Sequence, residues 1–360
     1  MGNRKWFGTA EALALESGER LPGYRLAYET WGTLAADGGN AVLIEHALTA
    51  DAHVAGPAGP GHPLAGWWDT LVGPGRVLDP AVHFIVAANV LGGCQGSTGP
   101  ASPSPDGKPW GSRFPSLTIR DQVAAEAALA DALGVRAWAA VLGGSMGGMR
   151  ALEWAVSYPD RVAALGVIAA PAQSSAEQIA WSWPQIRAIL DDPGWHGGDY
   201  HDLAAGEGPH VGLGIARRIA HITYRSETEL ATRFGRDPQT DENPLRDGRY
   251  AVESYLDHHA DKLVNRFDAA SYVTLVRAMD SHDVGRGRGG LVPALRRVRA
   301  KTLVAGVDSD RLYPLRQQIQ LAEDIRTAGP AKVINSPYGH DAFLLETGQL
   351  SPLIAELLTG

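Results

Sequence analysis

Hydrophobic residues in this chain follow two patterns, short unbroken apolar runs and longer stretches whose apolar residues recur every three or four positions. The runs are typical of strands buried on both faces of a sheet, and the longer spacing is typical of helices with one apolar face. Because the two patterns alternate, we expect an α/β fold with a mostly parallel sheet covered by helices on both faces. The expected strands are residues 25–31, 41–45, 82–88, 138–142, 163–169, 301–306 and 332–335, and the expected helices around them are 116–133, 151–156, 315–326 and 353–358.

The alternation stops near residue 171 and resumes near residue 301. Between these points the sequence shows helical patterns only. We therefore predict one α/β domain formed by residues 1–171 and 299–360, interrupted by an all-helical lid domain at 172–298. The expected lid helices are 177–190, 212–224, 250–265 and 269–279.

Net charge and cysteine content limit the classes of binding partner and the cellular compartment to be expected. The net charge of -8 over 360 residues argues against general affinity for nucleic acid or anionic membranes. Cys94 is the single cysteine, which excludes an internal disulfide and fits a reducing compartment. We see no signal peptide, and no apolar run approaches the length of a membrane span. We expect a cytoplasmic protein.

The segment Gly143-Gly-Ser-Met-Gly147 fits the G-x-S-x-G nucleophile elbow. A serine on a sharp turn between a strand and a helix exposes its hydroxyl, and the two outer glycines remove side chains that would collide there. The helix that follows points its first N–H groups at any oxyanion formed beside Ser145. The alternative is a glycine-rich turn in which Ser145 only caps a helix.

A nucleophilic serine needs a base and an acid that orients the base. Asp308 and Asp310 both follow the expected strand at 301–306, and His340 follows the expected strand at 332–335. Carboxyl ends of parallel strands share one edge of a sheet, which is where ligands bind. Periodicity does not choose between the two aspartates, and His340 could instead cap the next helix.

Two other features could indicate a bound dinucleotide or a metal ion, but each lacks the context that such a site requires. The segment G-R-G-R-G-G at 285–290 matches a dinucleotide-binding pattern, but it follows a helix and precedes a strand, the reverse of the required order. We expect a loop where the helical insertion rejoins the core. His46, His53 and His62, like the pair at 258–259, lack a cysteine or carboxylate at metal-ligand spacing, so we expect no metal site.

Eight motifs occur in one order along nearly the whole chain, and together they resemble the homoserine O-acetyltransferases of the α/β-hydrolase superfamily, particularly the actinobacterial type. One small departure is Ala50, where the family more commonly has glycine. The motifs are HALTADAH (46–53), GWWD (66–69), NVLGGCQGSTGPAS (89–102), RFPSLTIRDQV (113–123), GGSMGGMRALEW (143–154), SYPDRV (157–162), SDRLYP (309–314) and GHDAFL (339–344).

The resemblance implies a role for each matching residue. The catalytic triad would be Ser145, His340 and Asp310, because the family acid lies in the S-D-x-L-[FY]-P motif. The oxyanion hole would use the backbone N–H groups of Leu48 and Met146. In the substrate site, Arg217 would hold the homoserine carboxylate, Tyr224 would lie near it, and Asp341 would receive the ammonium group. Residues 217 and 224 are nearly two helical turns apart and therefore face the same way.

The resemblance also implies the reaction. Acetyl-CoA would acetylate Ser145, and L-homoserine would then accept the acetyl group, giving O-acetyl-L-homoserine for methionine biosynthesis by a ping-pong mechanism. Acetyl-CoA is a substrate here, so no bound cofactor or metal is expected, and in the family the lid builds a homodimer. Succinyl-CoA as donor, L-serine as acceptor, a plain esterase and a catalytically inactive binding protein remain alternatives.

Overall fold

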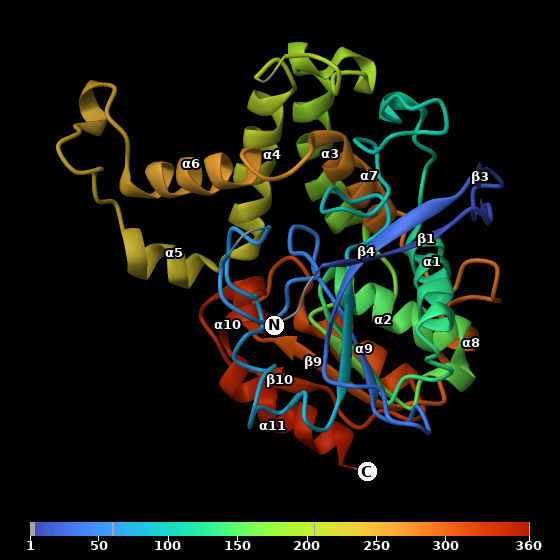
Figure 1. Cartoon of the computed structure of the whole chain (residues 1–360). Coiled ribbons are helices and arrows are strands. Elements are labelled where there is room, and N and C mark those ends of the chain that lie inside the picture. Colours follow the sequence, from blue (N-terminus) through green and yellow to red (C-terminus); the bar gives the residue numbers. More distant parts are fainter. Residues whose placement is uncertain (1–3, 60, 205, 360) are drawn as a thin grey trace.

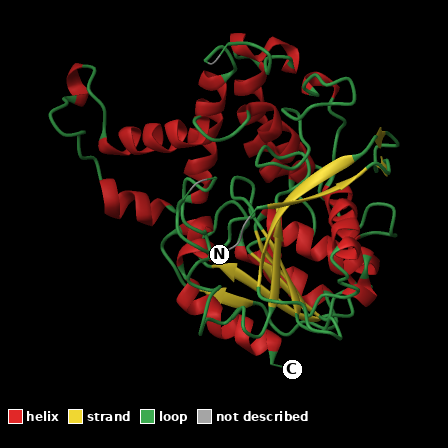
Figure 2. Ribbon diagram, in the orientation of Figure 1, coloured by secondary structure: helices red, strands yellow, loops and turns green. Residues whose placement is uncertain are grey.

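A computed structural model describes residues 4–59, 61–204 and 206–359. Its centre is an eight-stranded sheet in the order β1-β4-β6-β5-β7-β8-β9-β10 (Figures 1 and 2). The strands from β6 to β10 in this order run parallel, whereas β4 is antiparallel to both of its neighbours. The bounds are β1 Lys5–Thr9, β4 Tyr24–Trp31, β5 Ala41–Glu45, β6 Phe84–Ala88, β7 Ala140–Gly144, β8 Ala164–Ile168, β9 Lys301–Val307 and β10 Lys332–Ile334, and a separate pair joins β2 Leu13–Ala14 to β3 Arg20–Leu21.

Both faces of the sheet are buried, as the unbroken apolar runs predict. All five residues of β5, β7 and β8 are buried. Along β7, Val141 lies in the core formed with α1 and α2, whereas Leu142 lies in the core on the opposite face with α11. The helices outside residues 172–298 are α1 Ile119–Ala132, α2 Met146–Ser157, α9 Leu315–Asp324, α10 Ala342–Leu345 and α11 Thr347–Leu358, with 3-10 turns η1 Gly111–Arg113, η2 Pro159–Arg161 and η5 Gly339–Asp341; the short α8 Leu291–Leu295 lies at the end of the insertion.

Helices fill the chain between β8 and the short α8. Helices α3 and α4 pack together, and α4 also packs against α6 and against η5. Figure 1 shows α5 and α6 extending away from the body as an arm. Helix α5 was not expected from the sequence; it has only eight residues and begins at Ser226, which accepts a hydrogen bond from the Glu229 N–H. The bounds are α3 Ala176–Leu190, η3 Pro193–Gly198, α4 His210–Tyr224, α5 Glu227–Phe234, η4 Pro244–Arg246, α6 Ala251–Val264 and α7 Ala269–Asp280.

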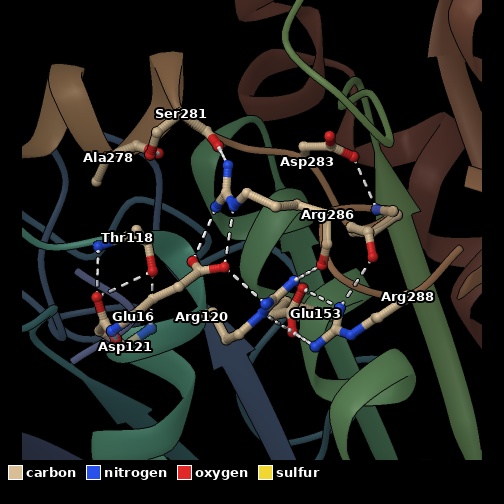
Figure 3. Close-up of polar contacts among 12 residues, drawn as sticks. Glu16, Thr118, Arg120, Asp121, Glu153, Ala278, Ser281, Asp283, Arg286 and Arg288 are labelled. Carbon is tan, nitrogen blue, oxygen red and sulfur yellow. Dashed lines mark hydrogen bonds and ion pairs between the residues drawn. The ribbon is translucent and has the colours of Figure 1, made fainter. Parts of the chain in front are cut away.

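The glycine- and arginine-rich segment at 285–290 is the loop by which the helical insertion returns to the core, as expected. Its arginines are held by ion pairs, which Figure 3 shows. Arg288 binds Glu153 of α2 with an N–O distance of 2.5 Å, and Arg286 binds Glu16 at 2.8 Å. Arg120 of α1 joins the two carboxylates, at 2.6 Å from Glu16 and 3.4 Å from Glu153. The loop therefore closes onto the core through internal charges.

Within the described residues, none of the helices combines the length and the apolar character needed to cross a lipid bilayer.

Candidate active site

Ser145 lies on a strained turn between β7 and α2. Its φ of 59° and ψ of -127° are unusual for a residue with a side chain. A Cβ on Gly147 would lie 2.0 Å from the Glu45 carbonyl oxygen, and one on Gly143 would lie 2.2 Å from the Gly147 carbonyl oxygen. Both positions therefore require glycine. The Ser145 side chain makes no capping hydrogen bond to α2, so the capping alternative is wrong.

The Ser145 hydroxyl meets a histidine from the far end of the chain. His340 lies in η5, just after β10, and its Nε2 is 2.9 Å from Ser145 Oγ. Its Nδ1 is 2.7 Å from Asp310 Oδ2. All three residues are buried. The geometry matches a nucleophile, a base and an orienting acid in one hydrogen-bonded row.

The turn after β9 separates the two candidate aspartates. Asp310 is buried, and its second oxygen accepts the backbone N–H groups of Leu312 and Tyr313 at 2.8 and 2.9 Å. Asp308 is exposed and accepts the N–H of Ser336 at 3.0 Å. The structure therefore places Asp310, and not Asp308, beside the histidine.

The charge of Asp310 governs the protonation of His340. Burial lowers the pKa of His340, but the charge of Asp310 and its hydrogen bond raise it, and the net pKa lies above the ordinary 6.5. A base whose protonated form is stabilised in this way suits a site where the histidine takes a proton from serine.

Two backbone N–H groups are free near the hydroxyl. Met146 is the first residue of α2, and Leu48 lies in the loop after β5 and lines the same cavity as Ser145. In the part of the chain that the structure describes, neither N–H donates a hydrogen bond to the protein. Unused donors beside a nucleophile are what an oxyanion hole requires.

A cavity of about 460 Å³ opens beside Ser145. This volume suits a small ligand. Its wall is built partly by the core and partly by helix α4 of the insertion. The polar side chains that line it, besides Ser145, include Asp51, Gln95, Arg217, Tyr224, Arg266, His340 and Asp341.

Arg217 and Tyr224 share one face of α4, as their spacing predicts. The Arg217 guanidinium carbon lies 5.4 Å from the centre of the Tyr224 ring. Its Nε and Nη1 are buried and have no hydrogen-bond partner among the described residues. Arg217 as a whole is half-buried. Buried N–H groups without a partner are costly, so this guanidinium is suited to an anion that enters the cavity.

Asp341 supplies a carboxylate to the same cavity. It forms an ion pair with Arg225, with an N–O distance of 3.2 Å. Burial raises the pKa of Asp341, and the charges of Arg225, His340 and Arg217 reverse this only in part. The cavity is thus lined by a cation, Arg217 from α4, and by a carboxyl group, Asp341 from η5.

Sequence reasoning missed Arg225 and Arg266. Arg225 directly follows Tyr224. This neighbour was the only feature of the sequence that could have pointed to Arg225 as a site residue. Arg266 lies between α6 and α7, and its Nη1 donates to the Thr49 carbonyl at 2.7 Å. No local pattern could have linked residues so far apart in the chain.

The metal-ligand argument needs a correction, because a carboxylate does reach the histidines. Glu29 of β4 lies 3.2 Å from His53 Nδ1 and 3.2 Å from His62 Nε2, and spacing could not reveal this contact from a distant strand. The two imidazole rings are stacked, with centroids 3.9 Å apart and planes 13° apart. Lone pairs in two stacked planes do not converge on one ion, so this arrangement fits a carboxylate bridging two imidazoles better than a metal centre.

Cys94 is half-buried, and its surroundings disfavour the thiolate that a nucleophile needs. Burial raises the pKa of its thiol to about 12, and its sulfur accepts the Asp268 N–H at 3.4 Å. The thiol is therefore held in its protonated, weakly reactive form.

Comparison with known proteins places this site in a family. Residues 40–347 match the alpha/beta hydrolase fold family. A homoserine O-acetyltransferase of Thermobifida fusca is 64% identical over 99% of this chain and 94% of its own length. One of Mycolicibacterium smegmatis is 55% identical over 96% of this chain and 91% of its own.

Solved structures agree on the fold. A homoserine O-acetyltransferase from Bacillus anthracis superposes with a TM-score of 0.91 at 27% identity, covering 100% of this chain and 98% of that one. Esterase E22 superposes with a TM-score of 0.90 at 26% identity, covering 99% of this chain and 100% of that one. On the strength of the sequence relatives, the chain belongs to the homoserine O-acetyltransferase family, built on the alpha/beta hydrolase fold.

Proposed function

We propose that this protein transfers an acetyl group from acetyl-CoA to the γ-hydroxyl of L-homoserine, giving O-acetyl-L-homoserine for methionine biosynthesis. The observation that carries the proposal is the pairing of charges around the nucleophile. Arg217 is half-buried, with its Nε and Nη1 buried and without a hydrogen-bond partner among the described residues, and it lines the same cavity as Asp341 and Ser145. An α-amino acid carries the complementary carboxylate and ammonium groups.

In the first half-reaction, His340 takes the proton from Ser145 as the hydroxyl attacks the thioester carbon of acetyl-CoA. Asp310 orients the imidazole and stabilises its protonated form. The N–H groups of Leu48 and Met146 stabilise the tetrahedral oxyanion; one such donor is typically worth roughly 3–4 kcal/mol. Collapse expels CoA as its thiol, protonated by His340, and leaves acetyl-Ser145.

In the second half-reaction, Arg217 holds the carboxylate of homoserine and Asp341 holds its ammonium group, with Tyr224 beside them. His340 then removes the proton from the γ-hydroxyl, which attacks the acetyl-serine. The ester leaves and Ser145 regains its proton. Because donor and acceptor occupy the site in turn, the kinetics should be ping-pong.

Transfer requires that water be kept from acetyl-Ser145. We assign this role to residues 172–298 as a helical lid, since α4 forms one wall of the cavity. The likeness to esterase E22 keeps hydrolysis as a second candidate. The two unpaired nitrogens of Arg217 favour transfer, because a simple ester offers them no anion.

We also propose that two copies assemble through the lid and that the enzyme works in the cytoplasm. Helices α3 and α4 expose apolar side chains on the surface: Ile179, Trp183, Val211 and Ile215 are 43%, 55%, 72% and 42% exposed. Exposed apolar groups on neighbouring helices favour a protein partner. Sedimentation of the wild type and of a Trp183→Glu variant tests this assembly.

Thiol release tests the activity. Acetyl-CoA and succinyl-CoA are each supplied with L-homoserine, with L-serine or with no acceptor. Release that needs both acetyl-CoA and homoserine supports the proposal. Strong release without acceptor indicates a hydrolase. Preference for succinyl-CoA or L-serine leaves the mechanism unchanged but shows that the donor or the acceptor is a different compound.

A further inference from the structure

A cluster of buried charged side chains, which takes no direct part in the proposed reaction, lies close to the elbow on α1, α2 and β5. Arg150 of α2 is fully buried, as is Glu45 at the end of β5, and Glu126 of α1 is 2% exposed. Arg150 Nη1 lies 2.6 Å from Glu126 and 2.8 Å from Glu45. The Trp154 indole N–H donates to the second Glu126 oxygen at 3.0 Å.

Arg150 is the one cation beside the two carboxyl groups of Glu126 and Glu45. Its charge compensates only one ionised carboxylate in this buried place. Both oxygens of Glu126 accept hydrogen bonds, from Arg150 and Trp154. Those of Glu45 accept none among the described residues. Burial and the neighbouring Glu126 hold the pKa of Glu45 well above its ordinary value, although Arg150 acts the other way. Glu126 is therefore the carboxyl most fully paired with Arg150, whereas the raised pKa of Glu45 favours its neutral form.

The guanidinium makes a third contact, and this one leads to the oxyanion hole. Arg150 Nη2 donates to the backbone carbonyl of His46 at 2.7 Å. His46 lies two residues before Leu48, and Arg150 lies one helical turn after Met146. One rigid side chain thus joins the two segments that present the free N–H groups of Leu48 and Met146.

The His46 ring secures the same loop from its other side. Burial and the charge of Arg150 lower the pKa of His46 to about 3, which keeps the imidazole neutral. Its Nε2 can therefore accept the Val90 N–H at 3.0 Å, while Nδ1 lies 2.8 Å from the Ala47 carbonyl. The backbone carbonyl and the ring of His46 thus both anchor the loop before Leu48.

We infer that Arg150 is a positioning residue, which sets the distance between the two N–H donors of the oxyanion hole and is itself held by Glu126. This rests on the proposed roles of Leu48 and Met146. Pre-placed donors stabilise a tetrahedral oxyanion without rearranging during the reaction, so a small shift of either donor slows the chemical step and leaves substrate binding intact.

The test removes the guanidinium without leaving a buried charge. The variant R150M/E126Q deletes both members of the ion pair. The matched control is R288M/E153Q, which deletes an ion pair on the same helix α2 that touches neither donor segment. Circular dichroism and thermal unfolding establish that both variants fold, and Arg150→Lys replaces the first variant if it does not.

Three readouts separate positioning from general damage. We expect R150M/E126Q to lower kcat by about 10- to 100-fold, because a displaced donor should cost less than the roughly 100- to 1,000-fold seen on losing one, while KM for homoserine stays within about threefold. Affinity for methylboronic acid, which forms a tetrahedral adduct on serine, should fall by a similar factor. The control should change none of these by more than about threefold.

Hydrolysis of p-nitrophenyl acetate is measured alongside, because acetylation of Ser145 by this ester needs the hole but not homoserine. Loss of ester hydrolysis together with boronate affinity supports the inference even if homoserine proves not to be the acceptor. Unchanged kcat and boronate affinity in a folded R150M/E126Q variant would overturn it. An equal loss of homoserine binding would also overturn it, since the whole site would then be disturbed.

Discussion

The raised pKa of Glu45 has a measurable consequence for stability. In the unfolded chain this carboxyl ionises near its ordinary pKa of 4.5, but in the folded protein its pKa is raised well above that value. The folded state then binds one more proton than the unfolded state, so stability is lost as the pH rises between the two pKa values. Glu45→Gln should remove this loss, because a neutral amide replaces a neutral acid of the same shape.

The size of the effect follows from the linkage of one proton. Each pH unit above 4.5 should cost the wild type about 1.4 kcal/mol relative to Glu45→Gln, as long as the pH stays below the folded pKa. The difference in unfolding free energy should therefore keep growing in favour of the variant as the pH rises from 4.5 towards the folded pKa.

Urea unfolding at about pH 6, 7 and 8 measures this difference, at one protein concentration and ionic strength, because assembly and salt also affect stability. Glu356→Gln is the control, since the side chain of Glu356 is 68% exposed. Parallel curves for wild type and Glu45→Gln would refute the reasoning, as they would mean that Glu45 is ionised in the folded protein.

Three further predictions concern the site. Ser145→Ala should abolish CoA release without changing thermal unfolding, and retained transfer would contradict its role as nucleophile. Asp310→Asn should lower kcat about 10⁴-fold; the acid limb of the kcat/KM profile should move to lower pH, because Asp310 raises the pKa of the base His340, which must be neutral to act. Arg217→Ala should lower kcat/KM for homoserine at least tenfold, about 1.4 kcal/mol, with an unchanged first burst of thiol; a smaller loss would remove its assignment to the carboxylate.

The elbow could be predicted from the sequence because its constraints are local. Gly143 and Gly147 are required by backbone atoms within a few residues or on the adjacent strand. The choice between Asp308 and Asp310 was different. Both follow the same strand, and only the turn after β9 decides which one is buried against His340. The family motif selected Asp310 where periodicity could not.

Contacts between distant segments set the limit of sequence reasoning. Glu29 joins His53 and His62 from β4, and Arg225 reaches Asp341 from the end of α4. Neither pairing has a characteristic spacing. Helix α5 was missed for another reason, because eight residues give periodicity too few turns to register.

The likeness to esterase E22 shows which part of the site decides the reaction. The two proteins superpose with a TM-score of 0.90 and therefore share a fold, so the fold alone does not separate transfer from hydrolysis. The separation must come from groups that bind an acceptor and exclude water. Under the proposed function those groups are Arg217 on α4 and Asp341 on η5, which line one cavity where α4 packs on η5. Acceptor specificity thus depends on how the helical insertion docks, and substitutions at that contact should alter homoserine use before they alter acetylation of Ser145.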